Sequence, residues 1–169
     1  MKKLLHFIIG FLLFLWQLPQ YIFFLFFDTV FAVKYKPYKR VKVAFKKGNG
    51  FEHKVEFIIL NGRKGRNYPP SAMAITGSKV FVFKDPYDNN EEYLRKNIYG
   101  HEFGHCVQSK MFGPAYILII GIPSLVYTFL NLRLVIKGKL TPEEYTEKMK
   151  NFYTEFTADD IASKYVMVE

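Results

Sequence analysis

The sequence predicts an α+β protein that carries a hydrophobic membrane-anchor helix at its N-terminus. Three observations support this prediction. Leu4 to Phe27 is a stretch of 24 residues without a formally charged side chain. Short apolar runs separated by turn residues fill positions 41–83, and capped helical patterns fill positions 91–166. Strands followed by helices in separate parts of one chain are typical of the α+β class.

The composition indicates one folded unit in addition to the apolar segment. The chain has 169 residues, a net charge of +9, and 50% hydrophobic residues, and this length is typical of a single domain. The apolar fraction excludes a disordered acidic tail. A disulfide scaffold is excluded because Cys106 is the only cysteine.

The N-terminal stretch is long enough for a membrane-spanning helix, which needs about 20 apolar residues. Gln17 and Pro19 interrupt it, and proline bends or breaks a helix. Three alternatives therefore stay open: a spanning helix, a broken helix or hairpin lying in the interface, and a signal peptide cleaved after Ala32. We assign residues 1–33 to a hydrophobic membrane anchor and residues 34–169 to a zincin-like metallopeptidase domain. The second assignment rests on the sequence motifs described below.

Seven lysines and arginines follow the anchor between positions 34 and 47, against two lysines and the amino group before it. Cytoplasmic flanks carry such an excess, so we expect a membrane-associated protein with its catalytic domain on the cytoplasmic side. Lys34 to Arg40 interleaves basic residues with tyrosine, as nucleic-acid sites do. Its position beside the anchor favours contact with anionic lipid headgroups instead, and no nucleic-acid partner is expected.

Strands are expected at 41–45 and 55–60, with a hairpin of 72–75 and 79–83 around a Thr-Gly-Ser turn. The proline-containing segment 62–70 is expected to be a loop. Helices follow. Asp88-Asn89-Asn90 predicts the N-cap of a helix that runs to about Met111 and stops at Gly113-Pro114.

Two further segments follow the helix that runs to about Met111, an apolar run and a last helix. Residues 116–130 form an apolar run that is short for a membrane span at 15 residues, so we expect it to be buried or interfacial. Thr141-Pro142 predicts the start of a last helix, which should run to about Val166.

The motif that carries chemistry is His101-Glu102-Phe103-Gly104-His105. Residues four apart lie on one helix face, so His101 and His105 can bind one tetrahedral zinc ion. Glu102 can flank the metal and act as general base towards metal-bound water. The alternative is a chance pair of histidines on a polar helix face.

Two glycines and a cysteine lie around this motif. Glycine is costly inside a helix, so Gly100 and Gly104 predict close approach of another element. Cys106 is expected to be a small core residue rather than a metal ligand.

A catalytic zinc site needs a third protein ligand and an open position for water. Glu155 and Asp159 lie four residues apart in the last helix. Glu155 is the expected third ligand, and Asp159 is expected to accept the free N–H of a ligating histidine. His53 is the weaker alternative ligand.

His101-Glu102-x-x-His105 followed by Glu155-x-x-Ala158-Asp159 resembles the gluzincin pattern of zinc peptidases, most closely that of the minigluzincins and of small bacterial membrane-associated peptidases. The resemblance implies that His101, His105 and Glu155 bind Zn²⁺, that Glu102 is the general base, and that Asp159 orients a histidine.

The resemblance also implies a fold, namely a small sheet packed with an active-site helix and a glutamate helix. An extended peptide would bind to the edge strand of that sheet, which we place at Ser71–Ile75 or Lys79–Phe83. Tyr153 is an available transition-state stabiliser, although no motif supports it.

We therefore expect a zinc-dependent endopeptidase that hydrolyses extended peptide or protein substrates. Two alternatives remain. One is a non-catalytic, zinc-stabilised membrane-associated module. The other is an intramembrane peptidase of the site-2 type, which the charged residues Glu91, Glu92 and Arg95 ahead of the motif disfavour.

Overall fold

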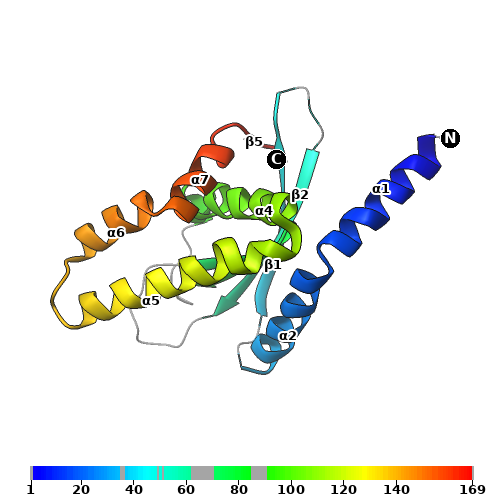
Figure 1. The fold of residues 1–169 in the computed structure, drawn as a ribbon. Coiled ribbons are helices and arrows are strands. Elements are labelled where there is room, and N and C mark those ends of the chain that lie inside the picture. Colours follow the sequence, from blue (N-terminus) through cyan, green and yellow to red (C-terminus); the bar gives the residue numbers. More distant parts are fainter. Residues whose placement is uncertain are drawn as a thin grey trace.

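The computed structural model describes residues 2–34, 37–48, 50, 52–61, 71–84 and 91–168. The predicted loop at 62–70 and the predicted N-cap at 88–90 lie outside these residues. The fold is α+β (Figure 1). The helices and strands are α1 (Lys2–Trp16), α2 (Leu18–Lys34), β1 (Pro37–Lys46), β2 (Glu52–Asn61), β3 (Ser71–Thr76), β4 (Lys79–Lys84), α3 (Glu91–Leu94), α4 (Gly100–Phe112), α5 (Ile122–Ile136), α6 (Pro142–Asn151), α7 (Tyr153–Ala162) and β5 (Val166–Val168). Shorter helical turns are η1 (Arg95–Tyr99), η2 (Gly113–Ala115) and η3 (Ile117–Gly121).

The sheet is mixed, with the strand order β3-β4-β2-β1-β5. β2 and β4 are parallel, and the other neighbours are antiparallel. The predicted hairpin is confirmed, because Ala72 pairs with Val82 and Ala74 with Val80. Of the two candidate edge strands, β3 lies at the edge. The β4 candidate is wrong, because β4 also pairs with β2 and is therefore internal.

One face of the sheet is covered by α2. Phe24 is buried and stacks on Phe81 with ring centroids 5.2 Å apart, and Phe31 packs edge-on against Phe81 and Phe83. Ile58 and Ile75 complete this cluster. The second half of the apolar N-terminal segment is therefore attached to the sheet, whereas the apolar side chains of α1 are largely exposed.

The N-terminal segment is broken at Gln17, where α1 and α2 meet at 63°. The Gln17 side chain accepts a hydrogen bond from the Gly77 amide at 3.2 Å, and the Gln20 side chain donates one to the Gly113 carbonyl. The structure therefore shows that the N-terminal segment bends at Gln17, and the three alternatives stay predictions. Glutamine side chains that would be unfavourable inside a bilayer find their partners in the rest of the chain.

The apolar run at 116–130 forms a longer helical segment than predicted. Residues Ile117–Ile136 are long and apolar enough to cross a membrane. Only 11% of the apolar 18-residue stretch within this segment is buried in the fold. The helix continues past the predicted end to Ile136, and the Asn131 side chain in its last part donates to the Tyr127 carbonyl at 2.8 Å. It stops before Gly138, which has a positive φ of 65°. Taken together, α1 and α2 are also long and apolar enough to cross a membrane.

The opposite face of the sheet packs against α4. Tyr99 stacks on Phe57 and Phe103 stacks on Phe45, each pair with ring centroids 4.1 Å apart. Cys106 is fully buried in this cluster, as predicted. α4 is thereby fixed on the sheet with its histidine face turned towards α7.

The predicted last helix is two helices. It begins as predicted, with Thr141 and Glu144 forming a reciprocal capping box. It ends at Asn151, because Phe152 has an extended backbone and stacks on Tyr127 at 4.0 Å. A new helix, α7, begins at Tyr153 and ends at Ala162 rather than at Val166. The residues that follow form the unpredicted strand β5, which pairs with β1.

Close approach of α4 and α7 occurs at Gly104. A Cβ atom built there would lie 2.1 Å from the carbonyl oxygen of Ala158, which is itself fully buried. The prediction is confirmed for Gly104 and wrong for Gly100, where a Cβ atom would meet nothing within 4 Å. The missing side chain at Gly104 sets the distance between the two helices.

We expect Gly104→Ala to lower the free energy of unfolding by about 1–3 kcal/mol, because the added methyl group forces the two backbones apart. Gly100→Ala is the matched control. It adds the same group in open space on the same helix, and it should raise stability by up to about 1 kcal/mol. Chemical denaturation of the two variants measures both effects, and equal effects of the two substitutions would contradict the prediction.

Candidate metal centre

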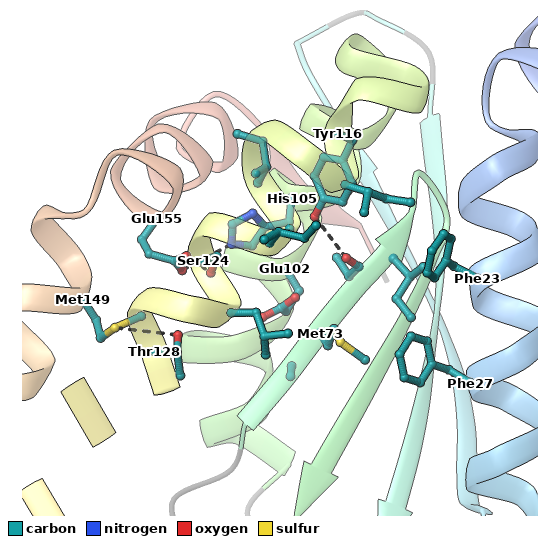
Figure 2. A pocket seen from close by; sticks show the side chains of 18 residues that line it. Phe23, Phe27, Met73, Glu102, His105, Tyr116, Ser124, Thr128, Met149 and Glu155 are labelled. Carbon is teal, nitrogen blue, oxygen red and sulfur yellow. Dashed lines mark hydrogen bonds and ion pairs between the residues drawn. The ribbon is translucent and has the colours of Figure 1, made fainter. Parts of the chain in front are cut away.

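Helices α4 and α7 bring together the three predicted ligands. The Nε2 atoms of His101 and His105 lie 3.0 and 3.3 Å from Oε2 of Glu155. One ligand atom from each of the three residues lies within 4.8 Å of the others. Figure 2 shows His105 and Glu155 turned towards each other across the site. Among the described residues, this is the one cluster of three or more His, Cys, Asp or Glu side chains that could hold a metal ion.

Hydrogen bonds on the far side of each imidazole orient the histidines. Nδ1 of His101 lies 2.7 Å from Oδ1 of Asp159, and Nδ1 of His105 lies 2.7 Å from Oε1 of Gln108. An acceptor at Nδ1 holds the proton there and leaves the Nε2 lone pair for a metal. Asp159 was predicted to act in this way.

Gln108 was not predicted to take part in the site. It lies three residues after His105 and is buried, and its amide donates to the Thr154 carbonyl at 3.0 Å and to Thr157 Oγ1 at 2.7 Å. Both of these partners belong to α7. The available signal in the sequence was a polar residue one helical turn after the second histidine, on the same face.

Glu155 is oriented by two hydroxyl groups. Oε1 accepts hydrogen bonds from Ser124 Oγ at 2.6 Å and from Thr154 Oγ1 at 2.8 Å, which leaves Oε2 directed at the histidines. Burial raises the pKa of Glu155, but hydrogen bonds from His101, His105 and Ser124 outweigh it and hold the pKa well below its usual range. Ser124 was missed because it lies in an apolar run with no motif around it.

His101 holds a proton in the metal-free site. Burial lowers its pKa, but hydrogen bonds to Asp159 and Glu155 outweigh burial and raise the pKa to about 10. At neutral pH the imidazolium therefore offsets the negative charge of the two carboxylates. A divalent cation at the same place would offset that charge in its stead.

Glu102 is the buried carboxylate beside the cluster. It is 6% exposed, and its Oε2 atom has no hydrogen-bond partner. Burial is the main cause that raises its pKa, while the nearby histidines act in the opposite direction. The carboxylate borders a cavity of about 390 Å³ that His105 and Glu155 also line. The site therefore places a buried carboxylate with a raised pKa in the wall of this cavity.

Tyr116 contributes a hydroxyl group to the same cavity. Its Oη donates a hydrogen bond to the Ala74 carbonyl of β3 at 3.0 Å (Figure 2). Tyr153, the candidate transition-state stabiliser, lies elsewhere and donates to the Ile119 carbonyl at 2.5 Å. No pattern in the sequence assigned a role to the Tyr116 side chain, which lies in the apolar run after Gly113-Pro114.

His53 lies outside the cluster. Its Nδ1 atom is 3.4 Å from the ammonium group of Lys110, and its ring packs edge-on against Tyr165. Burial and the charge of Lys110 both lower its pKa. The structure therefore gives His53 a packing role beside α4.

The donor set fits zinc. Two imidazole nitrogens and one carboxylate oxygen form the ligand set of catalytic His₂Glu zinc sites, which keep a fourth position open. Each ligand also has the outer hydrogen bond that such sites use to fix orientation. Comparisons of the chain with protein-family models, with curated proteins and with solved structures find no match.

Zinc affinity should rise with pH between about 6 and 8. Because the raised pKa keeps His101 protonated over this range, zinc must displace that proton, and its affinity should increase about tenfold per pH unit. Calorimetric titration in buffers of different ionisation enthalpy measures the number of protons released, which should be at least one per metal ion. A pH-independent affinity with no proton release would contradict this expectation.

Ser124→Ala should weaken zinc binding by about tenfold to a hundredfold, because it removes a hydrogen bond that orients Glu155. Ser163→Ala is the matched control, since Ser163 Oγ donates to the Asp160 carbonyl at an exposed position away from the cluster. Competition with a chromogenic chelator measures both affinities. Equal affinities of the two variants would exclude an orienting role for Ser124.

Proposed function

We propose that this protein is a zinc-dependent peptidase of the gluzincin type that hydrolyses extended peptide or protein substrates. The observation that carries the proposal is the position of Glu102. Its side chain, with one unpartnered carboxylate oxygen, lies beside three converging candidate ligands, and the residue lines a cavity large enough for part of a substrate. A purely structural metal site has no use for such a group.

The roles follow from the contacts. His101, His105 and Glu155 would hold Zn²⁺, which supplies Lewis-acid activation of a water molecule when it is bound. Glu102 accepts a proton at its free carboxylate oxygen and returns it to the leaving amine. Burial raises the pKa of Glu102 above its ordinary value, which favours its uptake of a proton from water. Asp159 holds His101 in the ligating orientation.

Strand β3 is the proposed binding edge for the peptide backbone. It lies at one end of the sheet and pairs only with β4 among the described strands. An extended peptide can join such an edge through main-chain hydrogen bonds. Ala72 and Ala74 of this strand line the same cavity as Glu102, so a peptide along β3 passes the proposed base.

We further propose that the protein associates with a membrane and places residues 34–169 on its cytoplasmic side. The support is the apolar surface of α1, α2 and α5, which includes Phe7, Leu25 and Phe129, each more than 60% exposed. Basic side chains that could meet anionic headgroups, such as Lys39 and Lys42, are exposed next to this part of the chain. α4 itself lies between the sheet and α7, so the proposed chemistry takes place in the folded domain.

Glu102→Gln should reduce peptide hydrolysis by about 10²–10⁴-fold, because the amide cannot accept the proton from water. Zinc binding should persist, since Glu102 is not one of the three ligands. Hydrolysis of a quenched fluorescent peptide library and the zinc content of the same preparations measure the two effects. His101→Ala is the complementary variant, and it should lose zinc and activity together.

Two outcomes would refute the proposal. Zinc bound at one ion per chain without cleavage of any peptide by the unaltered protein would favour the zinc-stabilised module instead. Unchanged hydrolysis by Glu102→Gln would refute the assignment of the base.

A further inference from the structure

The cavity beside Glu102 extends around the outer edge of β3. Its lining includes Ala72 and Ala74, which pack on the α4 side of the sheet, and Met73 and Ile75, which pack on the α2 side. Side chains of a strand alternate between the two faces of a sheet. The cavity therefore follows the exposed edge of the strand and reaches both faces.

The far wall of this cavity comes from the N-terminal helical segment. Phe23 and Phe27 of α2 line it, and Figure 2 shows both rings on the opposite side of β3 from Glu102 and Glu155. Most of the other lining side chains are also apolar, and those from the α5 side are Ile117, Ile120, Ile122, Leu125 and Met149. The polar groups of the cavity are concentrated near the metal cluster.

The wall is held in place by contacts before Phe23 and between Phe23 and Phe27. Gln17 and Gln20 bond to backbone groups of Gly77 and Gly113, and Phe24 is 6% exposed on the sheet. Phe23, between these contacts, is 48% exposed. Its ring is therefore accessible in the cavity, while the contacts of Gln17, Gln20 and Phe24 hold its helix in place.

We propose that α2 forms a substrate subsite, and that its occupant is an apolar side chain of an extended peptide bound along β3. This inference rests on the proposed peptidase function. In a peptide added to the edge of β3, one side chain points towards the metal cluster and the next points to the other face. On that face it meets Phe23, Phe27 and Met73, with no charged side chain among the lining residues of α2 and β3.

The inference assigns the N-terminal segment a part in substrate selection in addition to membrane attachment. A charged side chain at this position would lose water without gaining a partner. An apolar one would bury its surface against two aromatic rings. Substrates should therefore be apolar at the residue that faces α2.

The test uses the full-length, zinc-loaded protein and two hydroxamate probes built on one dipeptide scaffold. The two probes differ only at the residue expected to face α2, which carries either an isobutyl or a methyl side chain. The isobutyl probe should bind at least about tenfold more tightly, as hydrophobic pockets discriminate between such groups. Phe23→Ala should reduce this ratio at least threefold. Leu25→Ala is the matched control on the same helix: Leu25 is 61% exposed and does not line the cavity, so the ratio should not change.

The outcomes separate this inference from the proposed function. Tight binding of both probes with equal affinity, or a ratio unchanged by Phe23→Ala, would overturn the subsite while leaving the metal site intact. Failure to bind zinc and both probes would overturn the peptidase function, and the subsite with it. A loss of discrimination in Leu25→Ala equal to that in Phe23→Ala would also overturn the assignment, because the effect would then not come from the cavity wall.

Discussion

The candidate site depends on the approach of α4 and α7 at Gly104 and Ala158. Glu155 is separated from His105 by 50 residues along the chain, and no local structure could hold it within 3.3 Å of the imidazole. The contact of a glycine with a backbone carbonyl lets the two helices come close enough. Gln108 then joins them, because it bonds to a metal-ligand candidate on its own helix and to two groups of α7. The geometry of the cluster is thus a consequence of how tightly two helices pack.

The close packing of α4 and α7 also brings negatively charged carboxylates next to the histidines. Glu155 is held ionised inside the protein, and Asp159, which is exposed, adds a second carboxylate next to His101. A buried carboxylate is costly unless a positive charge lies beside it. In the metal-free protein a proton on His101 offsets the charge, and a divalent cation in the same place would offset it by contacting all three candidate ligands. The hydroxyl groups of Ser124 and Thr154 donate to Glu155 Oε1 and stabilise the ionised form of its carboxylate.

The sequence predicted the parts of the protein that depend on local spacing. The two histidines, Glu102 and the pair Glu155 and Asp159 follow from residues four apart on helices, and the hairpin of β3 and β4 follows from its turn. Sequence reasoning missed Ser124, Gln108 and Tyr116 because each acts through a partner more than 30 residues away or through the packing of a whole helix. The break at Phe152 was missed for the same reason, since its extended backbone is stabilised by stacking on Tyr127.

In the N-terminal segment, composition predicts apolar character, whereas the structure determines where the segment bends and which half packs on the sheet. Its hydropathy predicts membrane attachment but does not place a bend within the segment. The polar residues at its centre mark the place where it bends in the structure. Gln17 and Gln20 bond to Gly77 and Gly113, so the bend is part of the tertiary structure. Half of the segment is then fixed on the sheet by Phe24, and the other half is left with its apolar surface exposed. A helix attached in this way keeps the cavity wall that α2 forms in a fixed place relative to the candidate metal site, because hydrogen bonds join the segment to the rest of the fold at its bend.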